Sequence, residues 1–473
     1  MQYKHLLRYF LLLPFLIIVN GCTSLNAGLK KYPQKKFVIK NVNVIPMVNR
    51  GEVLLNATVI IENRIIVSIN GHIPNDAHVI NGKGKWLIPG LVDMHVHVPT
   101  DGTFNNTYPT RAAAIFTSTQ DVMTPFIANG VTTIFSLNSV VGNFGQRNEI
   151  IRGDVIGPRM ALAAMINGGN EVGTANTPSD GRQSVRFAKA EGYEFIKVYS
   201  SLNTKTYKAI VDEAHMQGMK VIGHIPNEFK NKIEEAFVPY FGMVAHAEEY
   251  AKQSEDFSYH DAQRFAKLAK QNGTWLSPTL IVISKIAEQT RTLDSIRNLV
   301  SLQYVHPLLQ NKWLTANKYN IGTSSERVIR LEKIVEFNNQ LVKAFKETGV
   351  PIVAGTDAGS SGVIAGFSLH DELELLVKAG LTTEEALVSA TRQPATWLGI
   401  ESKIGTVESG KFADLVLLDG NPLESIKNTR SIFGVFVDGR WLDKSHIKGM
   451  LSDLSKRNLA SKDKYEWSKR GEY

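Results

Sequence analysis

A regular alternation of short apolar segments with longer helix-like segments runs through residues 89–400 and limits the folds open to this chain. Eight apolar segments recur there, the first at 91–93 and the last at 351–355. Strands that alternate with helices indicate parallel βαβ units. Eight such units predict a (β/α)₈ barrel of the triosephosphate isomerase (TIM) type, a fold that takes about 250 residues. Residues 280–321 are too long for an ordinary connection, so we expect an insertion near the barrel mouth.

The segments on either side of this middle region are predicted to form β structure. Short β-branched runs separated by turn residues occupy 37–88 and return at 401–442. We therefore expect a small β-sandwich domain built from both terminal regions. The remaining C-terminal tail, 443–473, mixes Lys and Arg with Asp and Glu.

The N-terminus has the features of a targeting segment. Lys4 and Arg8 precede an apolar run at 10–19, which is too short for a standard membrane span. Residues 1–21 are therefore interpreted as a signal peptide, followed by a tether over 22–36. Cys22, directly after a glycine, resembles the lipidated cysteine of bacterial lipoproteins. That resemblance implies a lipid anchor in the bacterial cell envelope, at the outer membrane and facing the periplasm. The alternative is an ordinary signal peptide with an incidental cysteine.

Composition excludes several classes of protein. Cys22 is the only cysteine, so the chain can form neither an internal disulfide nor a thiolate metal site. The formal net charge is +8, but the basic residues are dispersed rather than gathered on one helix. We therefore expect a small-molecule substrate and no nucleic-acid partner. The sequence leaves homo-oligomer formation open.

Two short motifs place polar groups inside apolar strands. His95 and His97 lie two residues apart, so a strand would direct both imidazoles to the same face, where they could chelate one divalent ion. Lys197 lies between apolar neighbours, and a lysine there is costly unless its charge is removed or paired. A desolvated lysine can take up CO₂ as a carbamate, whereas a lysine at a strand end can also extend its amine to solvent.

Three more polar residues end apolar segments: His224, His246 and Asp357. Alone, each histidine would more often be a core residue, and the aspartate could simply form a turn. Together with the two motifs above, however, they lie at the carboxyl ends of predicted strands. Active sites of (β/α)₈ barrels lie at that face.

In this order, the motifs "WLIPGLVDMHVHV", "GVTTI", "FIKVYSS", "VIGHIP", "VAHAEE" and "VAGTDAG" resemble the amidohydrolase superfamily. The resemblance runs from Phe37 to Trp441 and is strongest to the binuclear branch of Xaa-Pro dipeptidases and imidazolonepropionase-like enzymes. Deaminases of this superfamily carry a glutamate where this chain has Asn227, so deamination is disfavoured.

The resemblance implies a metal site and a reaction. His95, His97 and Asp357 would bind one Zn²⁺, His224 and His246 would bind a second, and Lys197 as N6-carboxylysine would bridge them. Mn²⁺, Fe²⁺ and Co²⁺ also suit such donors. A hydroxide between the ions would attack an amide of a dipeptide or N-acyl amino acid, with Asp357 as the proton-transfer group.

Other roles and functions stay open. Tyr199 shares a strand face with Lys197 and is a candidate catalytic or substrate-binding residue, with barrel packing as the alternative. His370 either reaches the substrate or caps the following helix. A second enzymatic hypothesis is hydrolysis of cyclic amides or lactones. A non-enzymatic hypothesis is a membrane-anchored binding lipoprotein without catalysis.

Overall fold

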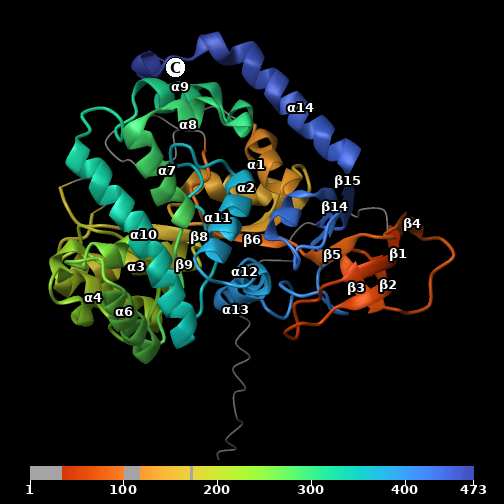
Figure 1. The fold of residues 1–473 in the computed structure, drawn as a ribbon, viewed down its shortest axis with the longest axis horizontal. Coiled ribbons are helices and arrows are strands. Elements are labelled where there is room, and N and C mark those ends of the chain that lie inside the picture. Colours follow the sequence, from red (N-terminus) through yellow and green to blue (C-terminus); the bar gives the residue numbers. More distant parts are fainter. Residues whose placement is uncertain (1–34, 101–117, 171–173, 473) are drawn as a thin grey trace, which may run out of the picture.

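The computed structural model describes residues 35–100, 118–170 and 174–472 (Figure 1). The predicted signal peptide, Cys22 and all but the end of the predicted tether lie outside these residues. Within the described part of the chain, no helix combines the length and the apolar character needed to cross a membrane.

The central domain is a barrel of parallel strands in sequence order. Each strand pairs with the next in the chain, so the sheet runs in one direction around the barrel. Its regular strands are β6 (Leu91–Val96), β7 (Val131–Ser136), β8 (Arg159–Ile166), β9 (Phe195–Val198), β10 (Lys220–Gly223), β11 (Phe241–Ala245) and β12 (Trp275–Ser277).

The eighth predicted strand closes the barrel as an irregular segment. Val353 N donates to Leu276 O at 2.9 Å on one side, and Met94 N donates to Ala354 O at 3.0 Å on the other. Pro351 has no backbone N–H, and Asp357 has a left-handed backbone with φ of 62°. Both features interrupt a regular ladder, so the predicted barrel is present with seven regular strands and one bridged segment.

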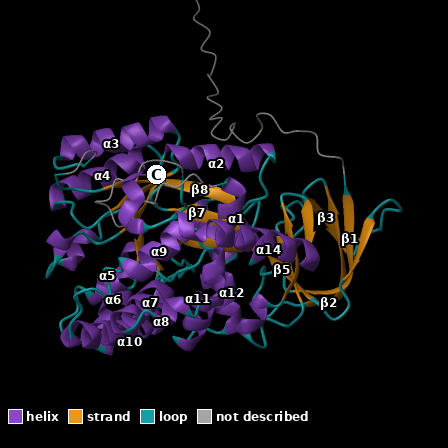
Figure 2. Cartoon of the chain, turned by 90° about the horizontal axis from the view of Figure 1, so that it is seen from above, coloured by secondary structure: helices purple, strands orange, loops and turns teal. Residues whose placement is uncertain are grey.

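Helices surround the barrel on its outer side (Figures 1 and 2). Their ends carry ordinary stop and start signals. Thr177, for example, caps α3 ahead of Pro178, and Gly192 ends that helix with φ of 92°. The surrounding helices are α1 (Thr119–Ala128), α2 (Val141–Arg152), α3 (Pro178–Glu191), α4 (Thr204–Met216), α5 (Glu248–Ala251), α6 (Tyr259–Asn272), α10 (Ser325–Thr348), α11 (Phe367–Lys378), α12 (Thr383–Ser389) and α13 (Arg392–Leu398).

An apolar layer fills the barrel interior. Phe195 stacks on Trp397 with ring centroids 5.3 Å apart, and Phe135 packs edge-on against Phe195 at 4.7 Å. Met94, Ile222 and Met243 belong to the same buried cluster. This layer excludes water from the barrel interior. Polar side chains further along these strands lie directly above it.

The two terminal regions form one further sheet, beside the barrel (Figure 1). Its order is β15-β14-β13-β5-β1-β2-β3, with β4 also paired to β1. Most neighbours are antiparallel, but β1 pairs with β4 and β5 in parallel. Phe37, Phe436 and Leu415 lie in its separate core. The strands are β1 (Lys36–Val44), β2 (Leu54–Glu62), β3 (Ile65–Ile69), β4 (His78–Asn81), β5 (Trp86–Pro89), β13 (Leu415–Leu418), β14 (Ile432–Val437) and β15 (Arg440–Asp443).

Two helical additions lie on the barrel. The expected insertion contains α7 (Leu280–Arg291), α8 (Asp294–Arg297), the 3₁₀ turn η3 (Val300–Tyr304) and α9 (Pro307–Thr315). The segment that we described as a tail contains α14 (Lys444–Ser461), which Figure 1 shows along the upper edge of the molecule and which packs against α1. Its apolar residues Ile447 and Leu454 are buried, and Ile447 packs with side chains of α1, β14 and β15, which explains why a charged sequence folds there.

Candidate metal centre and active site

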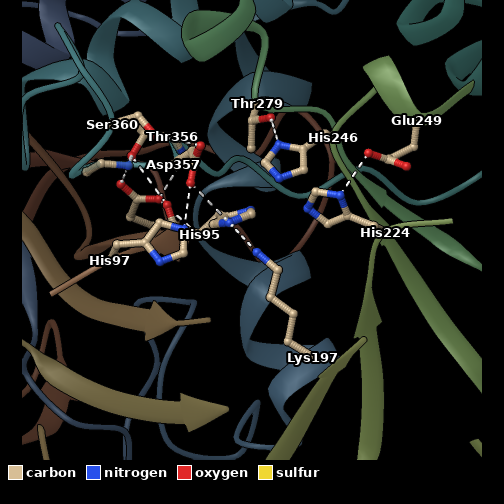
Figure 3. Close-up of polar contacts among 12 residues, drawn as sticks. His95, His97, Lys197, His224, His246, Glu249, Thr279, Thr356, Asp357 and Ser360 are labelled. Atoms are coloured by element: carbon tan, nitrogen blue, oxygen red, sulfur yellow. Dashed lines mark hydrogen bonds and ion pairs between the residues drawn. The ribbon is translucent and has the colours of Figure 1, made fainter. Parts of the chain in front are cut away.

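Six side chains converge over the apolar layer, each from the carboxyl end of a barrel segment (Figure 3). His95 is in β6 and Lys197 is in β9, whereas the other four residues directly follow such segments. Because parallel strands place these ends at one rim, residues far apart in the chain meet there. The six are the residues that we expected at the strand ends: His95, His97, Lys197, His224, His246 and Asp357.

His95, His97 and Asp357 form a tight group. Asp357 Oδ1 lies 2.8 Å from His97 Nε2 and 3.3 Å from His95 Nε2. One ligand atom from each residue falls within 4.8 Å of the other two. Imidazole and carboxylate donors at this spacing suit a divalent ion of the Zn²⁺ type.

Lys197 extends its amine into this group. Its side chain is buried, and Nζ lies 3.1 Å from His95 Nε2. Burial lowers the pKa of Lys197 to about 8, although Asp357 and Glu249 act in the opposite direction. A larger share of this amine is therefore uncharged at neutral pH than for a surface lysine, as carbamate formation requires.

His224 and His246 complete the cluster. Their ring centroids are 4.9 Å apart, and the His246 ring is 4.6 Å from that of His95. His246 Nδ1 lies 2.7 Å from Thr279 Oγ1. His224 Nδ1 lies 2.9 Å from Glu249 Oε1 and 3.0 Å from Ser200 Oγ.

The other nitrogen of His224 is the clearest sign of a bound ion. Among the described residues, the buried Nε2 atom of His224 has no hydrogen-bond partner. A buried imidazole nitrogen without a partner is costly, and the cost disappears when a cation accepts its lone pair. The donor set and this orphaned atom both fit divalent metal ions.

The backbone at the rim is strained at three of the residues involved. His246, Thr279 and Asp357 have φ values of 76°, 48° and 62°. Side chains other than glycine rarely adopt this conformation, and for the β-branched Thr279 it is especially unfavourable. Such outliers cluster at functional sites, where the surroundings enforce a required side-chain direction.

A glycine allows one of these strands to approach its neighbour. A Cβ atom added to Gly355 would lie 2.6 Å from Ser277 Oγ and 3.0 Å from His95 Cβ. A side chain at position 355 would therefore push apart the segments that carry His95 and Asp357.

Several supporting residues were missed in our reading of the sequence. Glu249 is buried and also accepts a hydrogen bond from Ile225 N at 3.2 Å. Its only sequence signal is its position three residues after His246, in the motif "VAHAEE". Thr279 gave no signal, because its contact to His246 depends on how β12 leads into α7.

Two buried carboxylates, Asp93 and Glu372, accept hydrogen bonds from segments that form the same rim. Asp93 accepts hydrogen bonds from Thr356 Oγ1 at 2.7 Å and from His95 N at 3.2 Å. Glu372 accepts from Leu280 N and Ile281 N at 3.0 and 2.7 Å, at the start of α7. Burial raises the pKa of Asp93 to about 7 and that of Glu372 to about 8.

The electrostatics favour the neutral form of three of the histidines and the ionised form of the aspartate. Burial, together with the charge of Lys197, lowers the pKa of His95 and His224 well below their usual value. Burial and the neighbouring His224 lower the pKa of His246 to about 3. Burial by itself would raise the pKa of Asp357, but His97, His246 and Lys197 together outweigh burial and lower this pKa. Neutral imidazole and ionised carboxylate are the forms that bind metals.

The structure distinguishes the two remaining candidate residues. The Tyr199 ring lies 4.1 Å from that of His224, so this side chain borders the cluster rather than the apolar layer. His370 lies instead in α11, where its buried ring bonds Thr429 Oγ1 at 2.9 Å. The expectation that His370 reaches the substrate therefore gains no support, because α11 turns its ring toward the η4 turn (Ile426–Arg430).

A parallel barrel that gathers imidazoles, a lysine and an aspartate at one rim is typical of hydrolases that hold divalent metal ions. The model of the amidohydrolase family matches residues 86–442. The chain therefore belongs to the amidohydrolase family, and as a member it is an enzyme that acts on carbon–nitrogen bonds.

Individual relatives are distant. An imidazolonepropionase from Thermoplasma volcanium is 23% identical over 369 residues, which cover 77% of this chain and 84% of that protein. A 5-methylthioadenosine/S-adenosylhomocysteine deaminase from Bacillus cereus is 22% identical, covering 80% and 84%. The crystal structure of a Xaa-Pro dipeptidase with bound methionine in the active site covers 86% of this chain and 100% of its own, with a TM-score of 0.65 and 22% identity.

Proposed function

We propose that this enzyme hydrolyses the amide bond of a dipeptide or N-acyl amino acid with the help of two divalent metal ions, Zn²⁺ being the expected metal. The observation that carries the proposal is the convergence of four imidazoles, a buried lysine amine and Asp357 at one rim, with His224 Nε2 left without a partner among the described residues.

In this proposal His95, His97 and Asp357 hold one ion, and His224 and His246 hold the other. Lys197, as N6-carboxylysine, lies between the two groups. Bound ions supply polarisation of the scissile carbonyl and a lowered pKa for the attacking water. The protein fixes the donors: Glu249 and Thr279 each hold one histidine nitrogen and leave the other directed into the site.

Asp357 is the proton-transfer group in this scheme. Its carboxylate accepts a proton from the attacking water and passes it to the leaving nitrogen. Ser360 Oγ donates to Asp357 Oδ2 at 2.9 Å, which keeps the carboxylate oriented. Tyr199, beside His224, is placed to contact the substrate carbonyl or carboxylate.

Amide hydrolysis is favoured over deamination by Asn227, which lies three residues after His224. Asn227 occupies the position where deaminases of this superfamily carry a glutamate, and a neutral amide cannot transfer a proton. The deaminases among the relatives therefore do not define the reaction proposed here.

The test is a substrate screen of purified, Zn²⁺-loaded protein. Dipeptides, N-acyl amino acids, cyclic amides and lactones are offered, with released amine or acid as the readout. We expect amine release from members of the first two groups. Asp357→Asn should leave a folded protein whose kcat is lower by about 10²–10⁴-fold, whereas Asp371→Asn, which alters an exposed carboxylate on α11, should not lower kcat. Activity on the cyclic substrates alone, or near-full activity of Asp357→Asn, would overturn the proposal.

We also propose that the enzyme is anchored to the bacterial outer membrane through a lipid on Cys22. The support is the position of this cysteine after an apolar run and a glycine. Expression of the full chain in a bacterium should give protein in the membrane fraction, and Cys22→Ala should move it to the soluble fraction. Equal membrane retention of the two proteins would contradict the anchor.

A further inference from the structure

A cavity of about 350 Å³ opens beside the metal centre and extends toward the C-terminal helix. Among the described residues, its inner end is formed by His97, Ala358 and Gly359. The first of these is a proposed metal ligand, and the other two directly follow Asp357. The cavity therefore borders the cluster where the reaction is proposed to occur, on the side of His97.

The cavity walls are mainly apolar and come from four separate parts of the chain. α1, the insertion, the loop after Asp357 and α14 each contribute. Their large apolar side chains include Phe126, Leu309, Trp313, Val363, Ile364 and Leu454. All six are largely buried, so the wall is held in place by the surrounding packing. A volume of this size accommodates a large side chain.

The charged groups in the walls neutralise each other. Arg457 donates to Asp121 through both Nε and Nη2, at 3.2 and 2.5 Å. His306 Nδ1 accepts from Leu308 N at 3.2 Å, and burial lowers the pKa of His306 to about 4, so its ring is neutral. With these groups already paired or uncharged, the walls suit an uncharged apolar group better than an ionic one.

The same contacts fix the outer wall. The Arg457–Asp121 pair ties α14 to α1, and Asn458 Nδ2 donates to Gln303 O and Val305 O at 2.9 and 3.1 Å, in and beside η3. Figure 1 shows α14 close to α1 and α9. Because the family match ends at residue 442, this wall comes from a part of the chain outside the matched region.

The position of the cavity relative to Asp357 indicates which half of the substrate, acyl or amine, the cavity contacts. In the proposed reaction, Asp357 gives its proton to the leaving nitrogen, and Ala358 and Gly359, which directly follow Asp357, line the cavity. On this basis the cavity is assigned to the amine half of the substrate. We infer that the cavity binds a large apolar side chain, aromatic or branched, on the amino acid released as the amine product. This inference rests on the proposed function and names the substrate class for it: dipeptides and N-acyl amino acids whose C-terminal residue is bulky and apolar.

The first test compares dipeptides on the Zn²⁺-loaded enzyme. Burial of a full aromatic or leucine side chain favours binding by about 10- to 100-fold. We therefore expect kcat/KM for Gly-Phe and Gly-Leu to exceed that for Gly-Ala by at least about tenfold. The reversed pair, Phe-Gly and Ala-Gly, should differ by less. Equal values for Gly-Phe and Gly-Ala, with either hydrolysed, would overturn the inference while leaving amide hydrolysis in place.

Two substitutions fill the cavity from different walls. Ala365→Phe adds a ring in the loop wall, and Ser461→Phe adds one at the end of α14. Each should lower kcat/KM for Gly-Phe by about tenfold or more with little change for Gly-Ala. Ser452→Phe, at an exposed position of the same helix, is the control and should change neither. The result contradicts the inference if both filling variants keep the preference for Gly-Phe.

A binding measurement separates this inference from the proposed reaction. Calorimetry of the Zn²⁺-loaded protein with L-phenylalanine and L-alanine needs no turnover. We expect L-phenylalanine to bind at least about tenfold more tightly, and Ala365→Phe and Ser461→Phe to remove that difference. If no amide is hydrolysed but this difference is found, the reaction is wrong and the cavity assignment stands. If the two amino acids bind equally or not at all, the cavity assignment is wrong.

Discussion

The Nδ1 atom of His224 lies 2.9 Å from the Oε1 atom of Glu249, a carboxylate without solvent exposure. This contact holds the proton on Nδ1 and leaves the lone pair of Nε2 directed into the cluster. Glu249 is itself held by Ile225 N and by the ammonium group of Lys252. In the proposed metal centre, the orientation of His224 therefore depends on Glu249, a residue that is not itself a proposed ligand.

Replacement of this carboxylate should weaken metal binding. Glu249→Gln can present its amide N–H to His224 and so lose the preferred tautomer. We expect metal affinity to fall by about 10- to 100-fold, as measured by competition with a chromophoric chelator. Glu248→Gln is a matched control, because Glu248 also pairs with Lys252. An unchanged affinity in Glu249→Gln would mean that Glu249 does not orient His224.

Lys197 offers a second test of the same centre. Lys197→Ala removes the buried amine beside His95, so we expect fewer bound metal ions per chain and a loss of activity of at least about 100-fold. Short carboxylic acids should restore part of both, because they supply the missing anionic oxygens. Lys220→Ala is the control, since Lys220 is a strand lysine that bonds the backbone of Trp397 at the other end of the barrel. Unchanged metal content and rate in Lys197→Ala would exclude the bridging role.

The buried Glu372 should make stability depend on pH. Burial raises its pKa from 4.5 to about 8 in the folded protein, and the nearby Asp93 and Asp371 act in the same direction. Between these values only the unfolded state loses the proton, so the free energy of unfolding should fall as pH rises from about 4.5 to 8. One proton contributes at most about 1.4 kcal/mol per pH unit.

Urea unfolding at several pH values tests this dependence. The wild type should lose stability across this window relative to Glu372→Gln, in which the group cannot ionise. Glu374→Gln, on the same helix but paired with Arg430 at the surface, should behave like the wild type. Parallel curves for the wild type and Glu372→Gln would show that Glu372 is ionised in the folded protein.

The meeting of the six side chains at the rim could be predicted because each of them ends or interrupts an apolar segment. His224 and Asp357 follow such segments directly, and a parallel barrel brings all strand ends to one rim. The supporting residues could not be found in this way. Glu372 acts on α7 from a helix about 90 residues further along the chain, and neither segment indicates the other.

The C-terminal region shows a different limit. Charged residues are frequent in 443–473, and the sparse buried positions Ile447 and Leu454 give only a weak helical pattern. Tertiary contacts determine where α14 lies: the burial of Ile447 and Leu454, together with the pairing of Arg457 with Asp121. Propensity alone is too small to predict such a placement.

The central claim is that six side chains at the barrel rim hold divalent ions that the enzyme needs for hydrolysis. The most direct measurement is the metal content per chain of the purified protein, followed by activity after chelation and after metal return. The account predicts two ions per chain, loss of activity on chelation and recovery with Zn²⁺ or a similar ion. A protein that remains fully active with no bound metal would contradict it.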